Sequence, residues 1–145
     1  MTQTTSHKLP RGFHTAGSTC GIKESGKPDL AVFVSEQPAV SAGVFTQNLV
    51  CGAPVVVSKQ RVGRTTSRAV VINSGNANAC TGERGIKDAE SMTAKLAEKL
   101  GCAAEDVLVC STGIIGHFLP LDIIQSGIEN IVSQTGGESA HLQAC

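Results

Sequence analysis

Short apolar runs rich in β-branched residues, separated by two longer segments with helical periodicity, constrain the fold of this chain most. Runs of this kind, bounded by glycine, proline and polar residues, are typical of buried strands. We predict five strands, at residues 30–35, 40–46, 54–58, 68–73 and 106–110. The turn-forming residues Gln37 and Pro38 would join the first two in an antiparallel hairpin.

Two helices are predicted between and after these runs. Residues 86–100 carry apolar side chains at i, i+3 and i+4 spacing, and Gly101 is a natural end to a helix. Residues 120–132 repeat the spacing, with Pro120 suited to a first turn. Residues 138–145 are typical of the start of a further helix. Because strands and helices do not strictly alternate, we predict an α/β fold with a mixed sheet.

The core of such a fold must be built almost without aromatic side chains. The chain has four phenylalanines and no tyrosine or tryptophan, although 41% of it is hydrophobic. Valine, isoleucine, leucine and alanine would therefore fill the core, which suits a sheet covered by helices. The 145 residues predict a single domain, residues 1–145, that buries roughly 68–70% of its unfolded surface. Residues 1–10 would form a flexible arm.

The charges exclude one class of partner. Lysine plus arginine and aspartate plus glutamate each total 12, so the formal net charge is zero. Such a surface does not attract a phosphate backbone, and we expect no nucleic-acid partner. No apolar run reaches the ~18 residues of a membrane helix, and the polar first residues do not resemble a signal segment. We therefore expect a soluble, cytoplasmic protein that does not contact a membrane.

Six cysteines are spread along the chain, at positions 20, 51, 80, 102, 110 and 145. An even number could indicate disulfides, but that interpretation requires a small secreted protein. No CxxC pair is present, so a zinc site is poorly supported and we expect no metal. We expect most of these cysteines to be small buried apolar side chains in a reducing cytosol.

The most chemically suggestive stretch is STGIIG, residues 111–116, directly after a predicted strand. Such a strand end can present consecutive backbone N–H groups and a hydroxyl to one point, which is how an oxyanion hole is built. Gly113 and Gly116 would allow the backbone to turn tightly and to approach a ligand. The same pattern is also typical of a glycine-rich turn, and the motif alone favours the turn.

A second polar stretch, NSGNANACTG at residues 73–82, follows the fourth predicted strand. Its asparagines could bind local backbone or a ligand. The GKS or GKT ending of a phosphate-binding loop is absent, as is a GxGxxG motif. We therefore favour a structural loop whose asparagines satisfy buried backbone groups.

The remaining candidates for acid–base chemistry are isolated. His14 and His117 could act because histidine titrates near neutral pH, and His117 lies just beyond STGIIG. No Ser-His-Asp or Cys-His constellation can be assembled from the spacing, so both are interpreted as ordinary surface or loop residues. Asp88 and Glu90 are interpreted as the solvated face of the first predicted helix.

Five segments, in order along the chain, carry a resemblance to a known family. They are parts of residues 11–23 (RGF, AG and CGIK), parts of 29–48 (DLA and AGVFTQN), 53–55 (APV), 73–82 (NSGNANACTG) and 111–120 (STGIIG and LP). In these segments the chain resembles the ornithine acetyltransferases, the bifunctional glutamate N-acetyltransferases of arginine biosynthesis. The match runs from Arg11 to about Ile131 and is typical of the amino-terminal portion, the alpha chain, of such an enzyme.

The resemblance implies a fold and a chemistry. The fold would be the mixed-sheet α/β sandwich of the self-cleaving ornithine acetyltransferase and DmpA type, of which this chain is an incomplete part. In that family a precursor cleaves itself, and the second (beta) chain begins with a nucleophilic threonine. Acetyl passes from N-acetylornithine to this threonine and then to glutamate, and some members also use acetyl-CoA as donor. By matching position, Thr112 and Gly113 would supply the oxyanion hole, in an assembly of two alpha and two beta chains without a bound cofactor.

The chain departs from the family in one large respect. It contains no Lys-Gly-Ala-Thr-like cleavage segment and no threonine-rich substrate-binding segment before it. We therefore expect this chain to be inactive alone. One alternative is a non-catalytic, truncated remnant or assembly module. A second is a related self-cleaving aminopeptidase, against which the NSGNANACTG segment argues.

Overall fold

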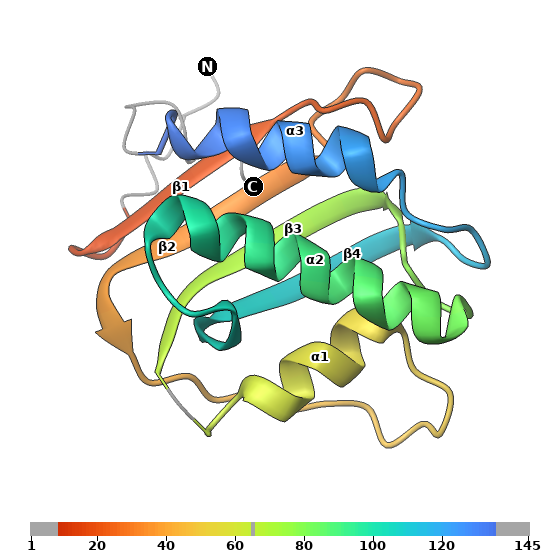
Figure 1. The fold of residues 1–145 in the computed structure, drawn as a ribbon, viewed down its shortest axis with the longest axis horizontal. Helices are drawn as coiled ribbons and strands as arrows, with labels where there is room; N and C mark the ends of the chain where they lie inside the picture. Colours follow the sequence, from red (N-terminus) through yellow and green to blue (C-terminus); the bar gives the residue numbers. More distant parts are fainter. Residues whose placement is uncertain (1–8, 65, 136–145) are drawn as a thin grey trace, which may run out of the picture.

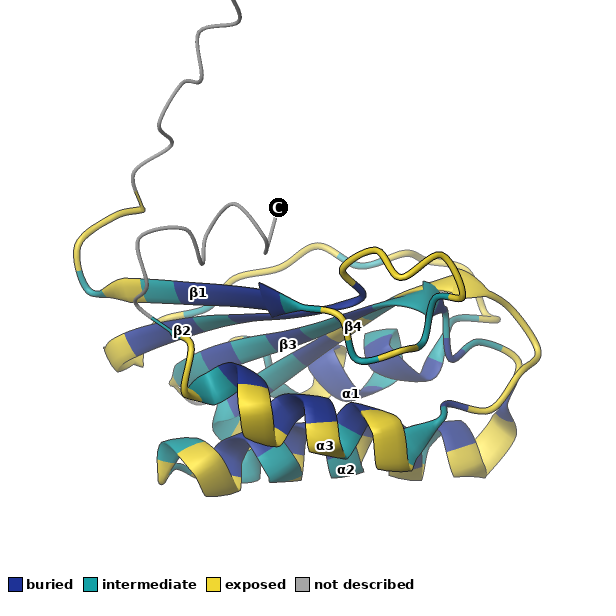
Figure 2. Cartoon of the chain, turned by 90° about the horizontal axis from the view of Figure 1, so that it is seen from above, coloured by how far each residue is buried: buried dark blue, intermediate teal, exposed yellow. Residues whose placement is uncertain are grey.

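The computed structural model describes residues 9–64 and 66–135. Within these ranges, four strands form one sheet, and three α-helices lie on the same side of it (Figures 1 and 2). In chain order the elements are β1 (Phe13–Ser18), β2 (Leu30–Ala39), α1 (Ala53–Arg61), β3 (Ser67–Asn76), α2 (Gly82–Leu100), a short 3₁₀ turn (Ala104–Asp106), β4 (Val107–Ile114) and α3 (Leu121–Val132). The predicted α/β class is confirmed.

The sheet has the order β1-β2-β3-β4 and mixes two kinds of pairing. β1 pairs antiparallel with β2, and β2 pairs antiparallel with β3. β3 and β4 are parallel, with Ala69 opposite Val107, and α2 forms the crossover between them. The carboxyl ends of β3 and β4 therefore lie at the same edge of the sheet (Figure 1).

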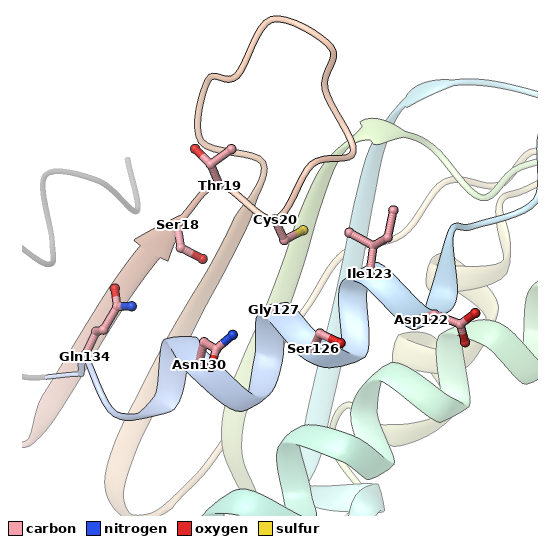
Figure 3. A pocket seen from close by; sticks show the side chains of 9 residues that line it. All are labelled: Ser18, Thr19, Cys20, Asp122, Ile123, Ser126, Gly127, Asn130 and Gln134. Carbon is pink, nitrogen blue, oxygen red and sulfur yellow. The ribbon is translucent and has the colours of Figure 1, made fainter.

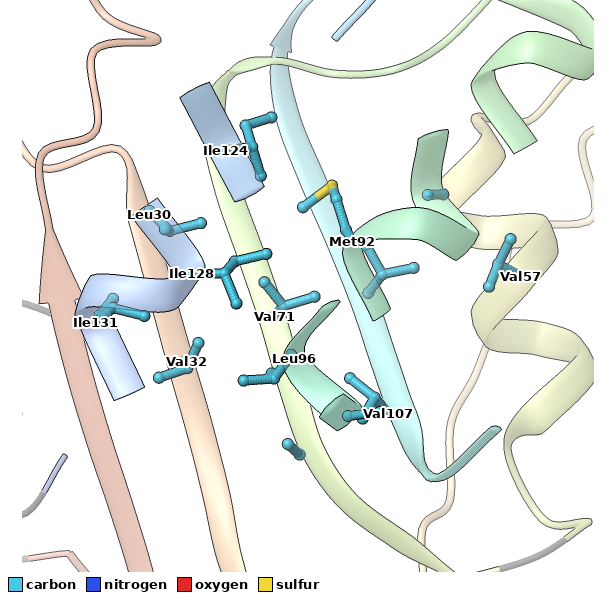
Figure 4. Close-up of a cluster of buried hydrophobic side chains, with 14 of the residues drawn as sticks. Leu30, Val32, Val57, Val71, Met92, Leu96, Val107, Ile124, Ile128 and Ile131 are labelled. Atoms are coloured by element: carbon cyan, nitrogen blue, oxygen red, sulfur yellow. The ribbon is translucent and has the colours of Figure 1, made fainter. Parts of the chain in front are cut away.

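The core lies between the sheet and the helices and contains no aromatic side chain. Its largest fully buried members are aliphatic or sulfur-containing. Ten of them are labelled in Figure 4, and Val109 is the eleventh: Leu30, Val32, Val57, Val71, Met92, Leu96, Val107, Val109, Ile124, Ile128 and Ile131. Burial of each such side chain contributes roughly 1.5–3 kcal/mol to the free energy that stabilises the folded state. The predicted aliphatic core is confirmed.

The prediction of a strand at residues 54–58 was wrong, because this segment lies in α1. Pro54 occupies a first-turn position, where its missing N–H costs the helix nothing. The Ser58 hydroxyl donates to the Val109 carbonyl over 2.7 Å and accepts the Val109 N–H over 3.0 Å. Arg61 donates to the Val107 carbonyl over 2.7 Å. α1 thus satisfies the outer backbone groups of the edge strand β4, and this tertiary role outweighs the strand preference of three consecutive valines.

The predicted hairpin between residues 30–35 and 40–46 was also wrong. Residues 40–46 lie outside the strands, and the antiparallel neighbours of β2 are instead β1, with Phe13 opposite Ser35, and β3. β1 was missed because its sequence, FHTAGS, is polar and glycine-containing. The described chain therefore has four strands where five were predicted.

The remaining predicted elements are confirmed with small changes of boundary. Residues 30–35, 68–73 and 106–110 fall almost entirely in β2, β3 and β4. α2 ends at Gly101 in the left-handed conformation, as its sequence predicted, whereas Pro120 directly precedes the first turn of α3. None of the described helices is long and apolar enough to span a bilayer. The helix predicted from residue 138 lies outside the described residues.

Two predictions about burial were wrong. None of the five described cysteines is fully buried or disulfide-bonded, and Cys80 and Cys110 are exposed. Asp88 is only 6% exposed, although Glu90 is exposed as predicted. Burial raises the pKa of Asp88, and the charge of Arg84, 3.8 Å away, partly opposes this rise. Asp88 lies four residues before Met92 and eight before Leu96, so helical spacing places it on the α2 face that turns toward the core; its charge alone had suggested the solvated face.

All the helices of residues 9–64 and 66–135 cover one face of the sheet, and none of them lies on the second face (Figure 2). Several apolar side chains on this second face are only partly covered, among them Phe33, Val70, Ile72 and Leu108. Along each strand they alternate with fully buried core residues, as the period of a strand requires. A sheet of this kind ordinarily packs both apolar faces, so this open face is a surface that a further layer could cover.

A buried carboxylate holds the loop between β1 and β2. Asp29 is 2% exposed and accepts the backbone N–H groups of four consecutive residues at 2.7–3.1 Å: Cys20, Gly21, Ile22 and Lys23. Burial raises the pKa of this carboxyl, but the hydrogen bonds from the loop lower it further, and the net pKa lies below the ordinary 3.8. The loop is therefore built around a charge rather than around a secondary-structure ladder.

Replacing this carboxylate should expose its role in stability. We expect Asp29→Asn to lower the free energy of unfolding by about 2–3 kcal/mol, because an amide cannot accept four N–H groups with one oxygen. In the unchanged chain, the contribution of Asp29 should be complete above its ordinary pKa of 3.8 and be lost as the pH falls through its lower folded-state pKa. Urea unfolding of both proteins between pH 2 and pH 7 would measure the two effects.

The matched control is Glu24→Gln, which neutralises an exposed carboxylate in the same loop. It should change the free energy of unfolding by less than about 0.5 kcal/mol. If the Asp29 and Glu24 variants were equally stable at pH 7, the carboxylate would not be what holds the loop.

Candidate functional site

The two polar stretches singled out from the sequence lie side by side at the carboxyl ends of β3 and β4. The parallel register places Asn73 opposite Ser111, Ser74 opposite Thr112 and Gly75 opposite Gly113. The pairing becomes irregular at Asn76, which faces both Thr112 and Ile114. NSGNANACTG and STGIIG are therefore one site rather than two.

Gly113 lies where no other residue fits. Its φ is +133°, which L side chains rarely adopt, and an added Cβ would overlap the carbonyl carbon of Gly75 and approach the Asn76 nitrogen at 2.5 Å. Gly75 has a φ of +115°, and a Cβ there would lie 2.9 Å from Ile22 and 3.1 Å from Lys23. The ends of β3 and β4 thus meet backbone against backbone, and side chains of the loop held by Asp29 pack against Gly75.

Asparagine side chains join the two stretches. Asn76, 5% exposed, donates from its side-chain nitrogen to the carbonyls of His117 (3.2 Å) and Phe118 (3.0 Å). Asn78, fully buried, donates to the Gly85 carbonyl over 2.8 Å and so ties the loop to α2. Asn73 donates to the Asn76 carbonyl over 2.8 Å. The prediction that these asparagines satisfy buried backbone groups is confirmed.

Thr112 and Gly113 are exposed at this edge, within reach of a ligand. The outer backbone groups of β4 are covered by α1 at Val107 and Val109, but this cover does not reach the end of the strand. Because backbone groups alternate along a parallel strand, those of Gly113 are expected to face the same outer side as those of Val109. Neighbouring Ile114 accepts the Ala77 N–H over 2.9 Å on the β3 side, in agreement with this alternation.

A cavity of about 360 Å³ opens beside β4 where the cover by α1 ends. Its walls are largely apolar and come from α1, from the segment before it and from the ends of β3 and β4: Phe45, Gly52, Pro54, Val55, Ser58, Ala77, Ala79, Val109, Cys110 and Ser111. The Ser111 hydroxyl is buried and has no hydrogen-bond partner among the described residues. A small, partly apolar ligand would fit in this cavity, against Ser111, the residue that precedes Thr112.

The histidines do not converge on this site. His117 is exposed, and only its backbone carbonyl bonds to Asn76. His14 lies near the start of β1, toward the opposite end of the sheet, where it pairs with Glu36 at 2.6 Å. Among the described residues, no group of three or more histidine, cysteine or carboxylate side chains could hold a metal ion. The interpretation of both histidines as surface residues agrees with this placement.

A second, shallower depression of about 480 Å³ lies between the end of β1 and α3 (Figure 3). It contains Cys20, which lies against Gly127 of α3. Burial, a hydrogen bond with Asp29 and the charge of Asp29 raise the pKa of the Cys20 thiol to about 12. A thiol that stays protonated at neutral pH is a poor nucleophile, so Cys20 does not favour covalent catalysis in this depression.

Comparison with known proteins places these features in a family. The model of the ArgJ family matches residues 14–144. The arginine biosynthesis bifunctional proteins ArgJ of Streptomyces coelicolor and Rhodopirellula baltica are 50% and 46% identical to this chain, over 91% and 92% of its length. The matched segments are only 36% and 32% of those proteins, so the chain spans about a third of the curated relatives it matches.

Solved structures give the same result. Ornithine acetyltransferase from Mycobacterium tuberculosis, complexed with ornithine, is 41% identical with a TM-score of 0.89, over 94% of this chain and 74% of that chain. ArgJ from Bacillus halodurans is 43% identical with a TM-score of 0.79, over 83% and 63% of the two chains. The observed fold is therefore shared with both.

The backbone contact at Gly113 gives a direct test of the site's architecture. We expect Gly113→Ala to lower the free energy of unfolding by about 3 kcal/mol or more, because strain in φ adds to overlap with Gly75. Gly116→Ala, with a φ of +83° and open space around its Cβ position, should cost only about 1–2 kcal/mol. Urea unfolding of both variants would measure the difference. Equal losses would mean that strain alone, and not the contact, requires glycine at 113.

Proposed function

This chain belongs to the ArgJ family, and we propose that it is the amino-terminal part of an acetyltransferase that moves acetyl from N-acetylornithine to glutamate in arginine biosynthesis. The family match and the likeness to an ornithine acetyltransferase structure support this proposal. The observation that carries it is the exposed Thr112–Gly113 segment at the carboxyl end of β4. The end of β3 lies directly against this segment, and the loop of residues 20–23, distant in sequence, packs on that end of β3.

In this proposal the chain stabilises charge and another part of the protein makes the attack. A threonine hydroxyl attacks the acetyl carbonyl of N-acetylornithine, and ornithine leaves with the threonine proton. The amine of glutamate then attacks the acetyl-threonine ester, and the threonine oxygen leaves with a proton from that amine, which regenerates the hydroxyl and releases N-acetylglutamate. Each step places negative charge on the acetyl oxygen. The Thr112 hydroxyl and the Gly113 N–H would donate to that oxygen, and the adjoining 360 Å³ cavity would accommodate the acetylated substrate.

We propose that the nucleophile comes from a second, beta chain released by self-cleavage, in an assembly of two alpha and two beta chains. The open apolar face of the sheet supports a further layer, as in a DmpA-like sandwich, because a two-layer fold leaves that face uncovered. The activity would need no bound cofactor, acetyl-CoA would serve as an alternative acetyl donor, and the protein would work in the cytoplasm.

The proposal predicts a specific loss of activity. We would join residues 1–131 of this chain to the remainder of the Streptomyces coelicolor relative and follow acetyl transfer from N-acetylornithine to glutamate. The joined protein should be active and the chain alone inactive. Thr112→Ala should lower kcat by on the order of 10²–10³, the usual effect of removing one oxyanion donor.

The matched control is Thr66→Ala, which removes an exposed threonine hydroxyl directly before β3, at the opposite end of the sheet from Thr112. It should leave kcat within about twofold. A folded but inactive joined protein would favour a non-catalytic module, and release of amino acids from peptides without acetyl transfer would favour an aminopeptidase. An unchanged kcat in Thr112→Ala would mean that the Thr112 hydroxyl is not an oxyanion donor.

A further inference from the structure

We propose that Asn76 is a positioning residue, whose side-chain amide fixes the Thr112–Gly113 segment in the geometry needed for oxyanion stabilisation. The inference rests on the proposed function for its catalytic consequence. Its structural part, that one buried amide sets the geometry of the loop at residues 111–118, stands independently of any reaction.

The amide of Asn76 is fully engaged, its nitrogen with the loop that follows β4 and its oxygen with the loop that follows β3. Its nitrogen donates to two consecutive carbonyls, those of His117 at 3.2 Å and Phe118 at 3.0 Å. Its oxygen accepts the Asn78 N–H over 2.8 Å. A reversed amide would turn its oxygen toward two carbonyl oxygens and its nitrogen toward an N–H, so the hydrogen bonds fix one orientation.

The loop around Gly113 needs such a restraint because the strand pairing becomes irregular there. Asn76 is the residue at which the β3–β4 register shifts, and it faces both Thr112 and Ile114. Two backbone bonds remain beyond this point, from the Ala77 N–H to the Ile114 carbonyl and from the Gly116 N–H to the Ala79 carbonyl, both at 2.9 Å. The Asn76 amide supplies two more, and together the four bonds hold the chain on the carboxyl side of Gly113.

Gly113 itself cannot contribute side-chain packing, and its backbone conformation is open to it only because it lacks a Cβ. The same freedom would let the segment move once a neighbouring restraint is lost. Oxyanion donors act only when they are held in place before the charge develops. A residue that orders residues 114–118 therefore sets where the Gly113 N–H and the Thr112 hydroxyl point.

Burial separates this role from substrate binding. Asn76 is 5% exposed, and the described contacts occupy its side-chain nitrogen and oxygen, whereas Thr112 and Gly113 are exposed. Asn76 therefore acts through the loop and not through contact with substrate. Its loss should appear in the chemical step, and the affinity for substrate should change little.

The structural part can be tested on this chain without any activity. Amide hydrogen exchange would be measured in the unchanged chain, in Asn76→Ala and in Asn130→Ala, an exposed asparagine on α3. We expect Asn76→Ala to reduce protection of the Gly116 and Ala77 amides by about tenfold or more, with Val71 and Val109 unchanged. Unchanged protection at Gly116 and Ala77 would overturn the inference, as would an equal loss at every amide.

The catalytic part uses the joined protein with the Streptomyces coelicolor remainder. Asn76→Ala should lower kcat by on the order of 10²-fold, as expected for a displacement of about 1 Å, while KM stays within about threefold. In Asn76→Ala combined with Thr112→Ala, the loss should be smaller than the product of the two single losses, because both act on one hole. Asn130→Ala should leave both constants unchanged.

Each outcome separates the two proposals. An inactive unchanged joined protein would count against the proposed function, while the exchange result would still decide the role of Asn76. An active protein in which Asn76→Ala raised KM alone, or in which the two losses multiplied, would overturn the positioning role. If Asn76→Ala did not fold, Asn76→Ser, which keeps a small polar side chain, would undergo the same measurements and be judged by the same outcomes.

Discussion

The close approach of two backbones, Gly75 on β3 and Gly113 on β4, is the constraint on which the rest of this site depends. Parallel strands at ordinary spacing leave room for side chains above and below the sheet. Here neither residue can carry one, and Ile22 and Lys23 close over Gly75 from the other side. The three segments can pack in this way only if the position of each backbone is fixed. Buried polar side chains near the contact, Asp29 and Asn76, supply the hydrogen bonds that fix these positions.

These two buried side chains form hydrogen bonds with backbone groups that have no partner in a helix or a strand. Asp29 accepts four backbone N–H groups from a loop that is not paired with any strand. Asn76 donates to two carbonyls at the point where the pairing of β3 with β4 becomes irregular. Unpaired buried groups would cost about 1–3 kcal/mol each, so the two side chains also define which loop conformation is stable. The site is therefore specified by hydrogen-bond satisfaction, whereas the rest of the fold is specified by aliphatic packing.

This division explains what the sequence could and could not predict. α2, α3, β3 and β4 follow from local periodicity, which depends only on neighbouring residues. α1 was mistaken for a strand because its helical state comes from Ser58 and Arg61 bonding to β4, more than 40 residues away. β1 was missed because its pairing with β2, not its own composition, makes it a strand. The stretches at 73–82 and 111–116 were each identified, but their contact is a property of the sheet register, which no local pattern contains.

The open face of the sheet has a thermodynamic consequence. If a second layer covers Phe33, Val70, Ile72 and Leu108, part of the energy that stabilises this fold belongs to an association and not to the chain itself. Folding and assembly would then be linked by mass action. The melting temperature of the assembled protein would rise with its concentration, and the fraction of molecules in which residues 111–118 keep the described geometry would depend on how much of the second layer is available.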